Sequence, residues 1–161
     1  MAVVNVVVAG LGGQGVIKAS EILADAAVRA GHDVKKAEVH GMSQRGGSVT
    51  TDVRFGDEVL SPMVPYGEAD FLVVLAPSEV AVTRALLREG GVLIGPDFVE
   101  ESSLPNKRSM NVALLGALSH HVDLPEEAWL GAIAAALPER LLDVNRQAFQ
   151  LGRKAAQERA R

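Results

Sequence analysis

Apolar positions in the first half of the chain follow two spacings, one typical of strands and one typical of helices. A near-continuous β-branched run over residues 2–9 predicts a buried central strand of a parallel sheet. Residues 16–30 carry apolar side chains at helical spacing, and Gly31 predicts the end of that helix. Residues 33–39 predict a second strand. The alternating segment 48–55 predicts a third strand with one buried face.

The middle of the chain continues the alternation of strand and helix. Residues 59–60 are expected to form a short partner strand, and residues 70–76 and 91–95 two further buried strands. A helix is predicted over residues 77–88, with Pro77 in its first turn. The polar segment 96–107 is expected to be irregular and exposed.

The last third of the chain is predicted to be helical. Apolar stripes indicate three helices, over residues 110–118, 125–137 and 138–158. Strands alternating with helices indicate an α/β fold: an open, mainly parallel, Rossmann-like sheet with helices on both faces and a helical C-terminal third. Because no repeat or linker divides the chain, residues 1–161 are expected to form a single domain.

Composition narrows the classes of function. The net charge of −4, without a long run of like charge, argues against nucleic-acid binding. The absence of cysteine excludes disulfides, a cysteine nucleophile and any iron–sulfur cluster held by thiolates of this chain. No apolar run approaches the ~18 residues of a membrane span, and residues 1–9 are too short for a signal sequence. We therefore expect a cytoplasmic protein that does not bind a membrane.

Residues 10–15, the first glycine loop, lie between the first strand and the first helix. Gly10, Gly12 and Gly15 satisfy the G-x-G-x-x-G spacing of dinucleotide sites, and Gly13 and Gln14 occupy the positions between them. The backbone N–H groups at the following helix start favour an anion. Three interpretations stay open: a nucleotide bound by this chain, contact with a partner subunit or its cofactor, or close packing alone.

Glu38 supports the nucleotide interpretation, because it lies near the end of the second strand, where a ribose-binding acid is expected. The alternative function is therefore a stand-alone Rossmann-type NAD(P)-binding oxidoreductase or a nucleotide-binding assembly module. A second glycine-rich loop argues against a simple nicotinamide site, which does not need one.

Residues 40–48, the second glycine loop, read HGMSQRGGS. The candidate site residues in this loop are His40, Gly41, Gln44, Arg45, Gly46, Gly47 and Ser48. Arg45 can bind a carboxylate or phosphate through two parallel hydrogen bonds. At the carboxyl edge of a parallel sheet, this loop would lie beside the first glycine loop, where ligands usually bind. A loop held by its own hydrogen bonds, with Arg45 solvated, is the alternative.

Further polar residues carry weaker signals. Asn111, near a helix start, is interpreted as a capping or loop-docking residue whose amide could reach the glycine loops. His120 and His121 lack the context of a metal motif and are favoured by the dipole at a helix C-terminus. Asp97 and Glu101 are expected in a solvated loop.

Three segments together resemble a known family. GLGGQGV at 10–16, EVHGMSQRGGSV at 38–49 and NVALLGAL at 111–118 occur in unbroken order over nearly the whole chain. They resemble the gamma-type domain of pyruvate and 2-oxoacid:ferredoxin oxidoreductases, most of all the beta subunit of the indolepyruvate enzymes. By position, the residues of the first glycine loop match the family's first motif, and those of the second glycine loop match its second motif.

The resemblance implies one subunit of a complex that converts a 2-oxoacid, coenzyme A and oxidised ferredoxin into acyl-CoA, carbon dioxide and reduced ferredoxin. It also implies that a larger partner holds thiamine diphosphate and the 4Fe-4S clusters, so this chain alone binds no cofactor, supplies no catalytic residue and is inactive. Both glycine loops and Asn111 are then expected to face the partner or coenzyme A. The isolated chain would expose an apolar docking surface and could form a homodimer.

Overall fold

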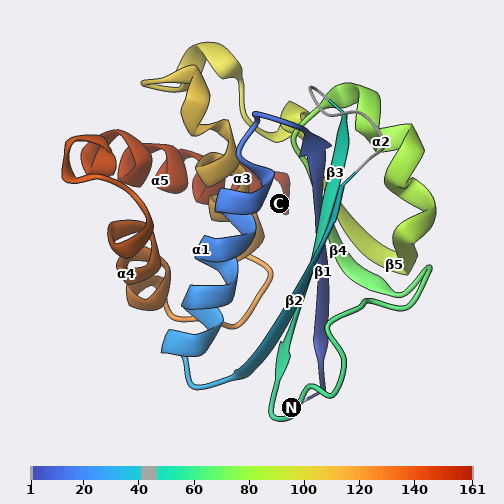
Figure 1. Cartoon of the computed structure of the whole chain (residues 1–161). Coiled ribbons are helices and arrows are strands. Elements are labelled where there is room, and N and C mark those ends of the chain that lie inside the picture. The colour runs from blue at the N-terminus through green and yellow to red at the C-terminus, as the bar shows by residue number, and fades with distance from the viewer. Residues whose placement is uncertain (1, 41–46, 161) are drawn as a thin grey trace.

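A five-stranded sheet forms the centre of the molecule in the computed structural model, which describes residues 2–40 and 47–160 (Figure 1). In chain order the strands are β1 (Val4–Leu11), β2 (Asp33–His40), β3 (Ser48–Gly56), β4 (Ala69–Val74) and β5 (Leu87–Ile94). Their order across the sheet is β2-β3-β1-β4-β5. β1, β4 and β5 pair in parallel, and only β3 runs against its two neighbours. The mainly parallel α/β fold is therefore confirmed.

β3 is reversed because the connection before it is short. Residues 41–47 join β2 to β3, whereas a crossover between parallel strands needs a dozen residues or more. The two strands pair in antiparallel register, from Asp33 opposite Gly56 to His40 opposite Val49. β3 then separates β2 from β1.

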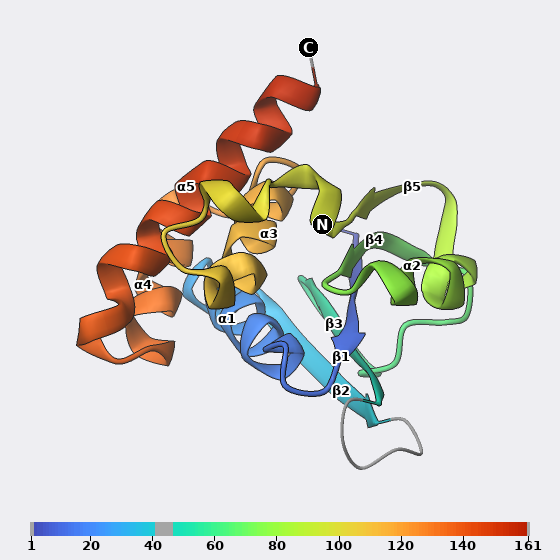
Figure 2. The same cartoon turned by 90° about the horizontal axis from the view of Figure 1, so that it is seen from above.

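Helices cover both faces of the sheet, as predicted. α1 (Val16–Arg29), α3 (Met110–Ser119), α4 (Glu126–Ala136) and α5 (Leu142–Arg159) lie on one side, and α2 (Pro77–Thr83) lies on the other (Figures 1 and 2). The connection from β1 to β2 thus crosses one face, through α1, while that from β4 to β5 crosses the opposite face, through α2. The crossovers change sides between the neighbouring strands β1 and β4, and such a switch point opens a crevice at the carboxyl ends of the strands.

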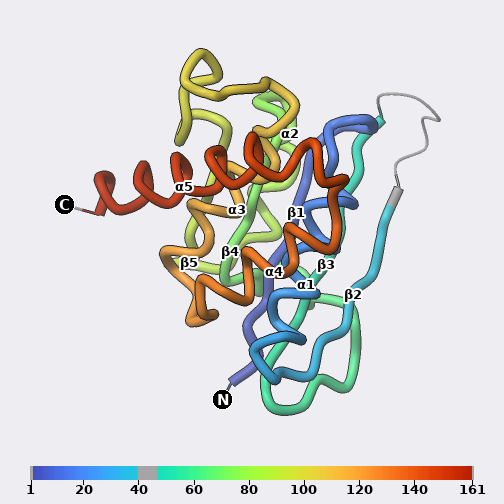
Figure 3. The backbone as a smooth tube through the Cα atoms, turned by 90° about the vertical axis from the view of Figure 1, so that its left-hand side faces the viewer, coloured from blue at the N-terminus to red at the C-terminus, as the bar shows by residue number. Residues whose placement is uncertain are grey.

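Strand alternation divides the apolar side chains between the two faces. Val6 and Val8 of β1 pack toward α1, and Val7 and Ala9 pack toward α2. On the α1 side, α5 crosses α3 closely (Figure 3). Gly116 and Gly152 permit this approach, since a Cβ on either would overlap backbone of the facing helix. The C-terminal helix is thereby attached to the main core.

Two sequence predictions for the middle of the chain were wrong. Residues 59–60 form no strand: the Val59 N–H donates to the side chain of Asp33, at 2.8 Å from Oδ2, and not to the backbone of a strand. The helix predicted over 77–88 ends at Thr83, and a 3-10 turn (Arg84–Leu86) leads into β5. Gly90, at φ +78°, lies inside β5, where the pairing with β4 is irregular.

Short 3-10 turns account for the remaining segments. They span Pro96–Phe98, Glu101–Ser103, Lys107–Ser109 and Glu139–Leu141. The segment 96–107 is irregular and mostly exposed, as predicted, although Val99 and Leu104 are buried. In the part of the chain that the structure describes, no helix is long and apolar enough to cross a bilayer.

Candidate functional site

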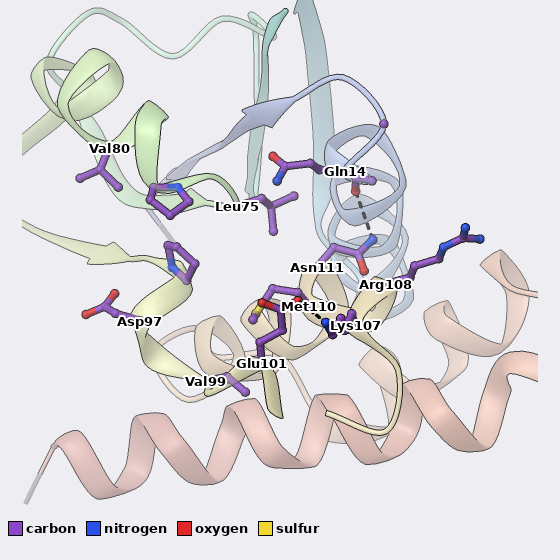
Figure 4. Close-up of a pocket in the computed structure, with 14 residues that line it drawn as sticks. Gln14, Leu75, Val80, Asp97, Val99, Glu101, Lys107, Arg108, Met110 and Asn111 are labelled. Carbon is purple, nitrogen blue, oxygen red and sulfur yellow. Dashed lines mark hydrogen bonds and ion pairs between the residues drawn. The ribbon is translucent and has the colours of Figure 1, made fainter. Parts of the chain in front are cut away.

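The main candidate site is a cavity of about 980 Å³ at the switch point between β1 and β4. It opens beside the first glycine loop and below α2 (Figure 4). Its walls are Gly13, Gln14, Gly15, Leu75, Pro77, Val80, Pro96, Asp97, Val99, Glu101, Lys107, Arg108, Met110 and Asn111. Three separate parts of the chain therefore build it: the first glycine loop, the start of α2, and the turns that lead into α3.

The first glycine loop has a backbone shape that requires glycine. Gly13 and Gly15 have φ values of +87° and +85°, a region that residues with a side chain rarely adopt. The Leu11 N–H donates to Gln14 Oε1 at 2.8 Å, so the Gln14 side chain folds back over the loop. A Cβ on Gly10 would lie 2.9 Å from that same oxygen. The loop is thus fixed by its own contacts immediately before α1 begins.

Asn111 attaches α3 to the first glycine loop. Its Nδ2 donates to the Gly15 carbonyl oxygen at 3.2 Å, and its Oδ1 accepts from the Val112 N–H at 2.9 Å (Figure 4). The side chain is buried, with 8% of its surface exposed. The structure therefore brings these two sequence-selected segments together across 96 positions.

The described part of the second glycine loop touches the first loop. The Gly12 N–H donates to the Gly47 carbonyl oxygen at 2.9 Å, and Ser48 lies opposite Leu11 in the β1–β3 register. His40 ends β2 at the same edge of the sheet. The other predicted site residues of this loop, Gly41, Gln44, Arg45 and Gly46, lie outside the described residues.

Glu38 does not occupy the position of a ribose-binding acid. In a dinucleotide site the acidic residue follows the strand next to β1. Here Glu38 lies on β2, and β3 separates that strand from β1. Because neighbouring strands are about 4.8 Å apart, β2 is shifted by one full strand from the required place. The arrangement therefore weakens the nicotinamide interpretation.

Charged side chains surround the cavity on its 3-10 side. Lys107 and Glu101 form a weak pair at 3.8 Å, and Asp97 pairs with Arg159 at 3.0 Å. Arg108 also lines the cavity and forms no ion pair with the described residues. Asp97 and Glu101 balance the two cations in number, and Arg108 is the lining cation left to bind an anionic ligand such as a phosphate. Sequence reasoning missed both cations because they belong to no motif.

Glu79 is a third residue that sequence reasoning missed. It lies on α2 with 5% of its surface exposed, and its Oε1 accepts a hydrogen bond from Ser48 Oγ at 2.8 Å. This bond connects α2 to the start of β3, beside the second glycine loop. The sequence places Glu79 and Thr83 four residues apart, on the same face of α2, and both are buried, but this spacing alone does not indicate a site.

The histidine pair forms an aromatic contact. His121 lies 6.0 Å from the Phe71 ring and 5.1 Å from the His120 ring, measured between centroids. Burial, followed by the neighbouring His120, lowers the pKa of His121 below its ordinary value. Over residues 2–40 and 47–160 no group of three metal-binding side chains occurs.

Known proteins match this chain over nearly its whole length. The family model described as pyruvate ferredoxin/flavodoxin oxidoreductase matches residues 5–105 and 96–155. Indolepyruvate oxidoreductase subunit IorB of Thermococcus kodakarensis is 36% identical over 194 aligned positions, which cover 96% of each chain. The common gamma subunit of the pyruvate/ketoisovalerate oxidoreductases of Pyrococcus furiosus is 32% identical over 79% of this chain and 74% of that protein.

Solved structures show the same fold. The gamma subunit of a keto/oxoacid ferredoxin oxidoreductase from Geobacter sulfurreducens superposes with a TM-score of 0.83 at 26% identity, over 96% of this chain and 99% of that one. The 2-oxoglutarate:ferredoxin oxidoreductase of Magnetococcus marinus, with coenzyme A bound, gives a TM-score of 0.85 at 21% identity. That match covers 98% of this chain and 32% of the larger one. These matches confirm the resemblance drawn from the glycine loops, and the chain belongs to the pyruvate ferredoxin/flavodoxin oxidoreductase family.

Proposed function

We propose that this chain is the small, cofactor-free subunit of a 2-oxoacid:ferredoxin oxidoreductase that acts on indolepyruvate or a related aryl pyruvate. The complex would convert the 2-oxoacid and coenzyme A into acyl-CoA and carbon dioxide, and pass two electrons singly to ferredoxin with release of one proton. Thiamine diphosphate supplies the carbanion sink in this chemistry and iron–sulfur clusters carry the electrons. We assign the clusters to the larger subunit, since this chain has no cysteine to hold one, and thiamine diphosphate to the same subunit on the basis of the family resemblance.

One observation carries the proposal for this chain's own part. The Gly12–Gly47 hydrogen bond joins the two glycine loops at the sheet edge, beside a cavity flanked by Lys107 and Arg108. Backbone N–H groups and cations at such an edge suit the phosphates of coenzyme A or a charged segment of the partner. We propose that both loops, with Asn111, order the partner's active-site surface or contact these phosphates. The whole chain would then form one domain of the complex.

Exposed apolar side chains of this chain support the presence of a docking surface for the partner subunit. Leu60, Met63 and Tyr66 lie in the connection between β3 and β4, with 86%, 50% and 77% of their surface exposed. Apolar side chains exposed together in one short connection are typical of a surface that associates with another chain. We therefore expect the purified chain to self-associate, as a homodimer, when the larger subunit is absent.

Co-expression with the candidate larger subunit tests this function. The purified complex should reduce a viologen dye in the presence of a 2-oxoacid and coenzyme A, and neither subunit should do so alone. Arg45→Ala should raise the coenzyme A requirement or lower activity without unfolding the chain, since a phosphate or carboxylate contact is lost. Arg140→Ala, at an exposed position in a 3-10 turn, is the matched control. Wild-type kinetics and assembly of the Arg45 variant would reject the role given to that loop.

The alternative, a stand-alone NAD(P)-binding oxidoreductase, predicts a different result. Calorimetry with the isolated chain would then give micromolar binding of NADH, and turnover would need no second polypeptide. The displacement of Glu38 from β1 supports the opposite expectation.

A further inference from the structure

The Glu79 carboxylate is buried although only one of its oxygens has a partner. Its Oε1 accepts from Ser48 Oγ at 2.8 Å, while Oε2 is enclosed and lacks a hydrogen-bond partner among the described residues. Among the described residues, two other buried side-chain atoms lack a hydrogen-bond partner, Thr51 Oγ1 and Trp129 Nε1, and both belong to uncharged side chains. A buried group without its partner costs on the order of 1–3 kcal/mol, and a charged group costs more.

Folding of this chain does not require the negative charge. A neutral amide at position 79 would accept the Ser48 hydrogen bond equally well. Thr83 Oγ1 bonds the Glu79 backbone carbonyl and not its carboxylate. Within residues 2–40 and 47–160, no lysine or arginine forms an ion pair with Glu79. The part of the chain that the structure describes therefore supplies no cation for this carboxylate.

The position of the carboxylate indicates where the missing partner comes from. Ser48 is exposed and begins β3, directly after Gly47, whose carbonyl oxygen accepts from the Gly12 N–H. Glu79 thus lies one hydrogen bond beneath the surface at the edge where the two glycine loops meet. Because Oε2 is enclosed and Ser48 Oγ occupies Oε1, a side chain that approaches over Ser48 has to displace the Ser48 hydroxyl before it can bond the carboxylate.

We propose that Glu79 accepts a lysine or arginine side chain of the larger subunit when the complex assembles. This inference rests on the proposed function, because it needs that subunit at this edge. A cationic donor that displaces the Ser48 hydroxyl forms a charge-assisted hydrogen bond with the carboxylate and balances a charge for which the described residues supply no cation. Glu79 then contributes to assembly and orientation at the edge that carries both loops.

Glu79→Gln separates this role from a structural one. In the isolated chain the substitution keeps an acceptor for Ser48 and removes an unpaired buried charge, so the melting temperature should stay the same or rise. In the complex it should weaken binding of the larger subunit at least tenfold by surface plasmon resonance, and reduce the salt dependence of that binding. These opposite signs are not expected of a residue that only stabilises the fold.

Two variants serve as controls, and a third variant replaces Glu79→Gln if the Glu79→Gln protein does not fold. Glu89→Gln removes an exposed charge and should leave the affinity unchanged. Ser48→Ala removes the internal hydrogen bond but keeps the charge, so it should weaken assembly less than Glu79→Gln does. Glu79→Met, which replaces the carboxylate by an apolar group of similar length, allows the same comparison.

The outcomes distinguish the two proposals. If the wild-type chain forms no complex with the larger subunit, the proposed function fails. If wild-type and Glu79→Gln chains assemble with equal affinity and equal salt dependence, the proposed function stands. In that case Oε2 is satisfied by water, by a residue of this chain within 41–46, or by nothing, and the inference is overturned.

Discussion

Asn111 Nδ2 donates a hydrogen bond to the Gly15 carbonyl oxygen at 3.2 Å, and the same nitrogen would lie 2.5 Å from a Cβ placed on Gly15. The start of α3 thus occupies the only direction in which Gly15 could carry a side chain. Gly13, two residues earlier, has nearly the same φ but no atom within 4 Å of an added Cβ. The two positions therefore separate backbone strain from steric contact.

Gly15→Ala should destabilise the chain more than Gly13→Ala does. A left-handed backbone costs alanine about 1–2 kcal/mol at either position. At Gly15, displacement of the Asn111 amide adds about 1 kcal/mol for the lost hydrogen bond. Urea denaturation of the isolated chain measures the difference, and Asn111→Ala should recover part of it in the double variant. Equal losses at both glycines would show that Asn111 moves aside without cost.

Gly116→Ala and Gly152→Ala should each lower the unfolding free energy by about 1–3 kcal/mol or more, as expected for overpacking. Their added Cβ atoms would meet the backbone at Phe149 and Ala113, so α3 and α5 would have to separate. Thermal unfolding followed by circular dichroism measures the effect.

Gly131→Ala is the control for this pair, because it lies in α4 and faces only the end of the Arg29 side chain. Alanine gains up to about 1 kcal/mol over glycine in a helix, so this variant should be neutral or slightly stabilised. A loss at Gly131 as large as at Gly116 would contradict the close helix crossing as the cause.

Asp33 and Asp52 should affect the pH dependence of stability with opposite signs. Each accepts a backbone N–H from the connection after β3, Asp33 from Val59 and Asp52 from Val64. The Val59 hydrogen bond lowers the pKa of Asp33 below its ordinary value of 3.8, so its charge stabilises the fold above that pH. Burial raises the pKa of Asp52 above 3.8, so stability falls as the pH rises from 3.8 through the raised value, and the loss is complete above it.

Chemical denaturation between pH 3 and pH 7 tests this contrast. Asp33→Asn should lower the unfolding free energy at pH 7, and its difference from wild type should shrink as the pH falls below 3.8. Asp52→Asn should raise that free energy at pH 7, and its difference should also shrink toward acid pH. Deviations of the same sign for both variants at pH 7 would contradict the assignment.

Local patterns predicted most of the strands and helices of this fold. The β-branched run of β1 and the helical spacing of α1 depend on residues close in sequence, and both elements form within two residues of the expected bounds. The antiparallel direction of β3 was not predicted, although the short connection before it excludes a parallel crossover. The end of α2 did not, because a shift in pairing between β4 and β5 decides where β5 begins.

The candidate site divides in a similar way. Glycine spacing indicated the first loop directly, since its backbone shape is encoded within six residues. Glu79 had no such signal, because its partner Ser48 lies 31 positions away on another element. Lys107 and Arg108 reach the cavity only through the fold of the turns before α3.

The hydrogen bond from the Gly12 N–H to the Gly47 carbonyl oxygen makes the two glycine loops thermodynamically dependent on each other. A ligand that displaces one of these two groups leaves the other without its hydrogen-bond partner, which costs free energy. Occupancy of one loop therefore changes the affinity of the other loop for its own ligand. Linkage requires the reverse effect to be equal in size. If coenzyme A engages one loop and the larger subunit the other, each will alter the dissociation constant of the other by the same factor.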